Sequence, residues 1–122
     1  MTPAEATLLY DGDCGFCRWS ADAVLRLDRR RRLRMLALQS EEASGLLPGM
    51  SQERRMSSWH LVAADGRVWS GGSAIAPLLR RLPGGRPAAA VADAFPNGTD
   101  RAYTWVSRHR ELLGRMLGRR AC

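Results

Sequence analysis

Short apolar runs alternate along the chain with segments of helical periodicity, and this alternation predicts an α/β fold. Residues 7–10 form an apolar, β-favouring run that ends in a turn composition, so we expect a buried strand that feeds a loop. Between residues 16 and 27 the apolar positions recur at helical spacing, which predicts a helix that begins near Cys14 or Gly15. Residues 33–38 predict a second strand. Strand, helix and strand in this order predict two parallel strands joined by a right-handed crossover.

The middle of the chain predicts a hairpin. Two β-favouring runs, residues 59–63 and 67–70, flank the dipeptide Asp65-Gly66. This dipeptide is a strong signal for an antiparallel hairpin, because glycine tolerates the positive φ of a primed turn. Between residues 40 and 55, where acidic residues and leucines mix with Gly and Pro, we expect short helical pieces.

The last third of the chain predicts helices. Apolar residues over 74–82 and 88–95 indicate one helix each, and the breakers at 96–98 are expected to end the second of them. A final amphipathic helix is then expected, with Asp100 as its N-cap and an end near Leu117.

The order of these elements, a βαβ half joined to a ββα half, predicts a thioredoxin-like α/β fold, with a mixed sheet flanked by helices and an extra C-terminal helix. A length of 122 residues fits a single domain over residues 1–122, because such a chain can bury one hydrophobic core. No apolar run approaches the roughly 20 residues that a membrane span needs, and the start of the chain lacks the pattern of a signal peptide. We therefore expect no membrane span and a cytoplasmic location.

The charge of the chain suggests an alternative function. All 19 basic residues are arginines, and the formal net charge is +7. A basic module that binds nucleic acid or an anionic surface would have such a charge. The absence of lysine is, however, a property of the whole chain, and the densest arginine cluster falls where a helix should end, where cations complement the helix dipole. We therefore expect no nucleic-acid partner. The cluster contains Arg26, Arg29, Arg30, Arg31, Arg32 and Arg34.

Three cysteines carry the candidate chemistry. Cys14 and Cys17 form a Cys-x-x-Cys pair, and Cys122 is the last residue. An odd count without a secretory signal argues against a structural disulfide framework. Cys122 is expected to be an incidental free thiol rather than a third catalytic sulfur.

The Cys-x-x-Cys pair suits thiol–disulfide exchange. At the first turn of a helix, Cys14 would meet unpaired N–H groups that stabilise its thiolate, which makes it the candidate nucleophile. Cys17 would lie one turn above on the same side, close enough to resolve a mixed disulfide. Gly15 would let a partner chain approach, and Phe16 would anchor the turn.

Two acidic residues precede the cysteines. Asp11 or Asp13 could accept the proton of Cys17 during exchange. Alternatively, Asp13 caps the helix and Asp11 forms an Asx-turn, and neither takes part in chemistry.

Residues 8–17, Leu-Leu-Tyr-Asp-Gly-Asp-Cys-Gly-Phe-Cys, resemble the signature of the DCC family of thiol-disulfide oxidoreductases. Asp65-Gly66, Gly72-Ser73-Ala74, Tyr103 and residues 108–110 also resemble that family's pattern, so the resemblance covers nearly the whole chain. It implies a thioredoxin-like fold and disulfide exchange, with Asp11, Cys14 and Cys17 as the residues after which the family is named. The implied partners are a protein or small-molecule thiol or disulfide and an electron donor. No cofactor is expected.

The chain differs from thioredoxins and glutaredoxins before the third strand, where those proteins have a cis-proline. Residues 56–59 contain no proline here, and Ser57 or Ser58 is expected to face the cysteines instead. Backbone N–H groups at Gly72 and Ser73 could hold an anionic group of the substrate, or they could form a plain turn and cap. The candidate substrate-binding residues are Gly15, Phe16, Ser58, Gly72 and Ser73.

A small zinc or iron–sulfur domain is the other alternative, and it would use the same cysteines. Zinc needs four ligands, and the chain has no second closely spaced pair. His60 falls in a predicted strand, where a hydrogen-bonded core histidine is commoner than a ligand. Disulfide exchange remains the preferred hypothesis.

Overall fold

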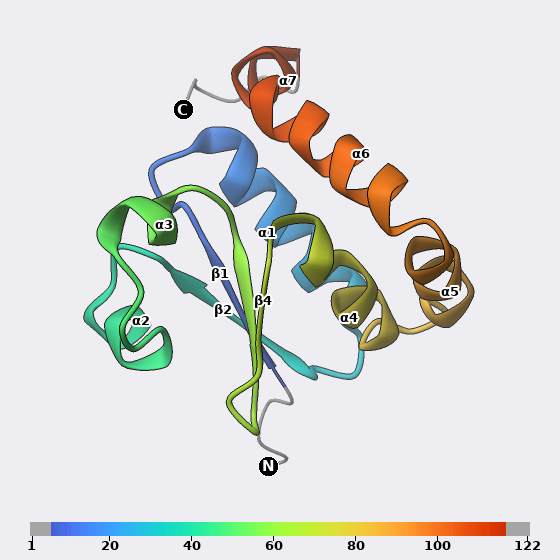
Figure 1. The fold of residues 1–122 in the computed structure, drawn as a ribbon, viewed down its shortest axis with the longest axis horizontal. Helices are drawn as coiled ribbons and strands as arrows, with labels where there is room; N and C mark the ends of the chain where they lie inside the picture. Colours follow the sequence, from blue (N-terminus) through green and yellow to red (C-terminus); the bar gives the residue numbers. More distant parts are fainter. Residues whose placement is uncertain (1–5, 117–122) are drawn as a thin grey trace.

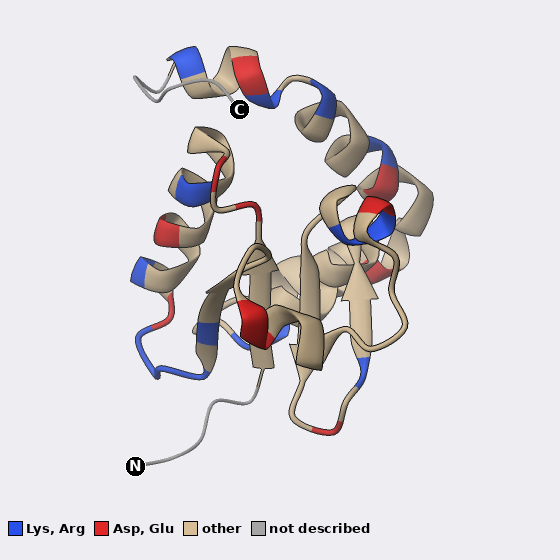
Figure 2. Cartoon of the chain, turned by 90° about the vertical axis from the view of Figure 1, so that its left-hand side faces the viewer, with Lys and Arg blue, Asp and Glu red and all other residues tan. Residues whose placement is uncertain are grey.

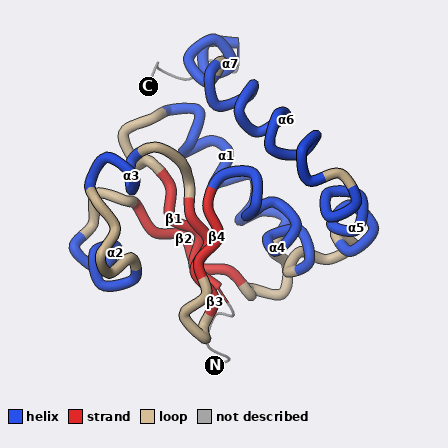
Figure 3. Tube along the Cα trace, viewed as in Figure 1, coloured by secondary structure: helices blue, strands red, loops and turns tan. Residues whose placement is uncertain are grey.

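The computed structural model describes residues 6–116, which form a four-stranded mixed sheet with helices on both faces (Figures 1 and 3). The strands are β1 (Ala6–Tyr10), β2 (Leu33–Ala37), β3 (His60–Ala63) and β4 (Val68–Ser70), in the spatial order β2-β1-β3-β4. β1 and β2 are parallel, whereas β3 is antiparallel to both β1 and β4. The predicted βαβ unit and the predicted hairpin are therefore confirmed, and the chain has the thioredoxin-like mixed sheet.

Helices follow the strands in the expected order. α1 (Gly15–Leu27) connects β1 to β2, and two short helices, α2 (Glu41–Leu46) and α3 (Gln52–Met56), precede β3. After β4 come a 3₁₀ turn, η1 (Gly71–Ala74), and the helices α4, α5, α6 and α7. Their bounds are Ile75–Arg80, Arg86–Ala94, Pro96–Arg108 and Arg110–Met116. No helix within residues 6–116 is long and apolar enough to cross a membrane.

Alternate residues of the strands bury opposite faces of the sheet. Leu8 and Leu61 belong to a core cluster that also contains residues of η1 and α4. Leu9 and Val62, one position further along each strand, pack instead with Ala43 of α2. Because side chains alternate across a strand, one sheet supplies two hydrophobic cores and the fold has three layers. Figure 1 shows α2 and α3 on one side of the sheet and α1 and α4 on the other.

Residues 29–32, four arginines of the densest arginine cluster, lie in the turn between α1 and β2 (Figure 2), whereas Arg26 lies in α1 and Arg34 in β2. A buried carboxylate organises this turn: Asp28, 4% exposed, accepts hydrogen bonds from the N–H groups of Arg32 at 3.0 Å and Leu33 at 2.9 Å. The last turn of α1 carries Arg26, a favourable position relative to the helix dipole.

The prediction for the final helix is wrong at its start. Residues 96–98 do not separate two helices, because α6 begins at Pro96 with Phe95 as its N-cap. Proline is favoured at the first helical position, where its missing N–H has no intrahelical partner to lose. Asp100 therefore lies inside α6. The predicted single helix is also interrupted at His109, where α6 ends, and its predicted end at Leu117 lies outside the described residues.

Candidate active site

The Cys-x-x-Cys motif lies where β1 passes into α1, as predicted. Cys14 is the N-cap of α1, and its Sγ accepts a hydrogen bond from the Cys17 N–H at 3.4 Å. The Cys14 side chain is fully buried, whereas Cys17 is half-buried. The Cys14 sulfur therefore faces the positive end of the helix dipole, where a thiolate is stabilised.

The two cysteines are not bonded to each other. Cys14 is disulfide-bonded, and Cys17 is a free thiol. Experiments that need both Cys14 and Cys17 as thiols therefore have to start from protein whose Cys14 disulfide has been reduced. Cys122, expected to be an incidental thiol, lies outside the described residues.

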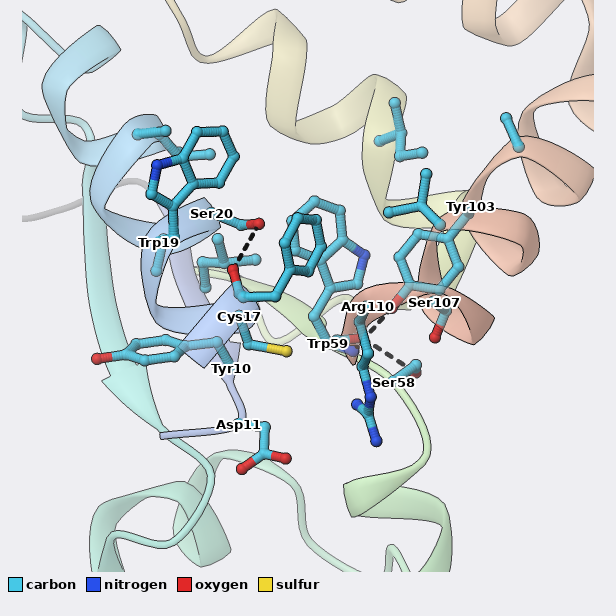
Figure 4. A pocket seen from close by; sticks show the side chains of 18 of the residues that line it. Tyr10, Asp11, Cys17, Trp19, Ser20, Ser58, Trp59, Tyr103, Ser107 and Arg110 are labelled. Atoms are coloured by element: carbon cyan, nitrogen blue, oxygen red, sulfur yellow. Dashed lines mark hydrogen bonds between the residues drawn. The ribbon is translucent and has the colours of Figure 1, made fainter. Parts of the chain in front are cut away.

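Two opposite charges flank the Cys17 thiol. Burial raises the pKa of Cys17, and the Asp11 carboxylate raises it further. The Arg110 guanidinium lowers the pKa of the same thiol through its charge and a hydrogen bond, but burial dominates. Figure 4 shows Cys17, Asp11 and Arg110 around one space, although they come from different segments of the chain. At neutral pH the Cys17 thiol is thus held protonated, between the Asp11 carboxylate and the Arg110 guanidinium.

The loop before α1 is fixed by a glutamine from beyond β2. Asp11 Oδ1 accepts hydrogen bonds from the Asp13 N–H at 3.0 Å and from Gln39 Nε2 at 2.7 Å. Gln39 Oε1 accepts the Gly12 N–H at 3.0 Å. The Asx-turn, one of the two alternatives considered for Asp11, is present. The capping role considered for Asp13 is wrong, because Cys14 occupies the N-cap and Asp13 is exposed.

A cavity of about 360 Å³ opens beside Cys17. It brings together four of the residues predicted from sequence, Asp11, Phe16, Cys17 and Ser58. Cys14 and Gly15 do not line it, because both are buried at the start of α1. Most of its wall is apolar or aromatic and comes from α1, from the segment before β3 and from α6. The remaining lining residues include Leu8, Tyr10, Trp19, Ser20, Val24, Met56, Trp59, Ile75, Tyr103, Val106, Ser107 and Arg110.

Tyr103 of α6 closes one wall of this cavity. Its ring stacks on Trp59 with a centroid separation of 5.6 Å, and its hydroxyl accepts the Trp59 N–H at 3.2 Å. The Trp59 indole donates in turn to the carbonyl of Gly71 at 2.8 Å. Burial raises the pKa of Tyr103, so the phenol stays neutral. These contacts hold α6 against the sheet and give the cavity an aromatic wall.

Ser58, rather than Ser57, faces the cysteine site. Ser58 lines the cavity and donates its hydroxyl to the carbonyl of Trp59 at 3.1 Å. Ser57 is exposed and donates to the carbonyl of Arg54 at 2.6 Å. Of the two serines considered for this side of the cysteines, Ser58 is therefore the one that lies at the cavity.

The structure does not bring Gly72 and Ser73 to this cavity. They line a separate hollow that also contains the carboxylates of Asp93 and Asp100. The Ser73 hydroxyl donates to the carbonyl of Ser70 at 2.7 Å, so it is used in the turn. An anionic group at this hollow would meet two acidic side chains.

His60, considered as a metal ligand, is a core residue. It is 1% exposed, and its ring nitrogens lie 2.6 Å from Ser70 Oγ and 2.9 Å from the carbonyl oxygen of Arg55. Burial lowers the pKa of His60, so the ring is neutral near pH 7. Between residues 6 and 116, no three His, Cys, Asp or Glu side chains are grouped as metal ligands.

Sequence reasoning assigned no role to three residues of the site, Gln39, Tyr103 and Arg110. Gln39 could have been found from the predicted parallel pairing of β1 and β2. That pairing places the carboxyl ends of both strands at one edge of the sheet, so the residues after β2 lie near those after β1. Tyr103 and Arg110 belonged to the family pattern, but nothing in their local sequence indicates which residues they contact.

Comparison with known proteins agrees with the signature at residues 8–17. No curated protein and no solved structure matches the chain. The family model of the DCC1-like thiol-disulfide oxidoreductases matches residues 8–116, a span that contains the cysteine motif, Tyr103 and Arg110. The chain therefore belongs to the DCC1-like thiol-disulfide oxidoreductase family.

Proposed function

We propose that this chain exchanges dithiol for disulfide through Cys14 and Cys17, with Asp11 as the third catalytic residue. The observation that carries the proposal is the Cys14 sulfur at the N-cap of α1, hydrogen-bonded to the Cys17 N–H. The expected substrates are protein or small-molecule disulfides. We place the activity in the cytoplasm, where thiols are kept reduced.

Cys14 is the proposed nucleophile. The N–H groups at the start of α1 favour its thiolate, and the thiolate is the reactive form. It attacks one sulfur of the substrate disulfide. A bond forms between Cys14 and that sulfur, the substrate's S–S bond breaks, and the other substrate sulfur leaves as a thiolate.

Cys17 is the proposed resolving residue, and its raised pKa supports this role. A thiol that stays protonated does not compete with Cys14 for the substrate. Asp11 accepts the Cys17 proton when the mixed disulfide is resolved, and Arg110 stabilises the thiolate that forms. Cys17 then attacks Cys14 Sγ, the Cys14–Cys17 bond forms, and the substrate leaves as a thiolate.

Two further residues are proposed to contact the substrate at the cavity, Phe16 and Ser58. Gly15 is proposed to leave space for the approaching substrate, because it lies between the two cysteines and carries no side chain. Gly72 and Ser73, which line the separate hollow, are left out of this site.

Single-cysteine variants test the proposal. Cys14→Ser should abolish turnover in a disulfide-reduction assay, whereas Cys17→Ser should accumulate a mixed disulfide at Cys14 that mass spectrometry can locate. Trapping from cell lysate with Cys17→Ser would then identify the substrates. Full activity of Cys14→Ser would contradict the mechanism.

A further inference from the structure

We propose that the cavity beside Cys17 binds the electron donor, and that this donor is a compact, uncharged, largely apolar thiol. The inference rests on the proposed function. The donor enters the cavity after the reduced substrate has left Phe16 and Ser58, and it supplies the half-reaction that regenerates the two thiols. It concerns the side of the cysteine pair that faces the cavity, which is the Cys17 side.

Access distinguishes the two sulfurs. Cys17 lines the cavity and is half-buried, whereas Cys14 does not line it and is 0% exposed. A thiol held in the cavity therefore meets Cys17 first. Attack at this sulfur is also chemically favourable, because it expels Cys14, the thiolate that the helix N-terminus stabilises best.

The walls of the cavity indicate the chemistry of the donor. Phe16 stacks with Trp19 and Trp59 stacks with Tyr103, so two aromatic pairs contribute to the lining. A volume of about 360 Å³ lies at the lower end of the range for small-molecule sites and cannot admit a folded protein surface. The occupant should therefore be a small molecule with an apolar or aromatic body.

Among the lining residues that fall within 6–116, the charged ones are only Asp11 and Arg110. Both act on the Cys17 thiol, which they influence with opposite sign. They are therefore already used for sulfur chemistry at that end of the cavity. A donor that carries carboxylates and an ammonium group, such as glutathione, would have to bury charges against aromatic rings without partners, which is costly.

The reaction balances with two donor molecules. The first thiol gives its proton to Asp11, and its sulfur attacks Cys17 Sγ of the oxidised pair. The donor–Cys17 bond forms, the Cys14–Cys17 bond breaks, and Cys14 leaves as a thiolate. The sulfur of a second donor thiol attacks the sulfur of the first, the donor–Cys17 bond breaks, and the donor disulfide forms. The proton of the second thiol passes to the Cys17 thiolate and the proton held by Asp11 passes to the Cys14 thiolate, so that two donor thiols are oxidised and one protein disulfide is reduced.

Three thiols test the inference on the full-length chain oxidised to the Cys14–Cys17 disulfide. They are benzyl mercaptan, 2-mercaptoethanol, whose thiol has nearly the same acidity, and glutathione. The rate of reduction is followed by tryptophan fluorescence and by counting free thiols. Benzyl mercaptan should react at least about tenfold faster than the other two, because its ring is buried on binding, and its rate should saturate with concentration. Equal rates, or a preference for glutathione, would overturn the inference.

Cavity-filling variants supply the second arm of the test. Ala23→Leu and Ala102→Leu add side chain to the lining from α1 and α6, and either should bring benzyl mercaptan down to the rate of 2-mercaptoethanol. Ala102 is exposed, so Ala102→Leu should disturb the core little. It keeps the test available if Ala23→Leu fails to fold. Ala90→Leu is the matched control, since Ala90 is an exposed residue of α5 outside the lining. A preference that survives both cavity variants would contradict the assignment.

The two proposals fail in different ways. If reduction of the oxidised protein shows no selectivity among the thiols, but the reduced protein still reduces disulfides through Cys14, the donor site is wrong and the proposed function stands. If Cys14→Ser retains full turnover, the proposed function itself is wrong.

Discussion

Arg110, the first residue of α7, interacts with Cys17 of α1, and its positive charge and hydrogen bond oppose the effect of burial on that thiol. The α1 and α7 helices contact each other, so a residue near the end of the chain tunes a cysteine near its beginning. Asp11 acts on the same thiol with the opposite sign. Removing the charge of Arg110 and removing the charge of Asp11 should therefore change the pKa of Cys17 in opposite directions.

Arg110→Gln should raise the pKa of Cys17 further, because it removes the charge and the hydrogen bond that favour the thiolate. The measurement is the pH dependence of Cys17 alkylation by iodoacetamide, in a Cys14→Ser background so that one thiol of the motif reacts. Arg108→Gln is the control, since Arg108 is exposed on α6 and does not line the cavity. An alkylation profile that stays in place or moves to lower pH would contradict the interaction.

Asp11→Asn should lower the pKa of Cys17, because a neutral amide replaces the carboxylate while its oxygen can still accept the Asp13 N–H. Disulfide turnover should nevertheless fall by about a hundredfold, since the proton acceptor is lost. A lower pKa of Cys17 together with a lower turnover would indicate a catalytic role, because unfolding would remove the influence of the fold on the Cys17 pKa as well as the activity. Asp13→Asn, the control, should leave both quantities nearly unchanged, and an equal effect of the two substitutions would argue that Asp11 acts only through the turn.

Gly72→Ala should destabilise the fold by about 1–3 kcal/mol, because an added Cβ would lie 2.8 Å from the Asp100 Cα and would push η1 away from α6. Urea unfolding measures the loss. Gly45→Ala is a matched control: its Cβ would meet nothing within 4 Å, and within α2 the change should stabilise by about 0.5–1 kcal/mol. Equal stability of the two variants would show that the close approach of η1 and α6 does not matter.

The stability of the protein should depend on pH through His60. Its pKa is lowered in the fold by burial, so the unfolded state binds more protons as the pH falls. The free energy of unfolding should therefore be highest above the ordinary histidine pKa of 6.5 and should decrease as the pH falls through the lower value of the folded state. Urea unfolding at neutral and mildly acidic pH measures this slope.

Two variants check the assignment to His60. His60→Gln should flatten the slope, whereas His109→Gln should retain it, because His109 lies in the break between α6 and α7 rather than in the core. A slope that persists in His60→Gln would assign the pH dependence to another group.

Local sequence predicted the elements that depend on local physics. The period of apolar residues located α1 and the strands on either side of it, and Asp65-Gly66 located the hairpin. The start of α6 was missed because Pro96 favours the first turn of a helix as readily as it ends the preceding one. The break between α6 and α7 at His109 was not predicted, because no glycine or proline lies next to it in the sequence.

The sequence by itself determined the fold class, the family and the position of Cys14 at a helix N-terminus, because each of these follows from patterns within a few adjacent residues or turns. Only the tertiary structure decided that Cys17, not Cys14, faces the cavity and that Tyr103 and Arg110 complete it. The same tertiary contacts tie Gln39 to Asp11 and separate Gly72 and Ser73 from the cysteines. Such pairings join segments far apart in the chain, and they arise from how helices pack on both faces of a twisted sheet, which local periodicity does not encode.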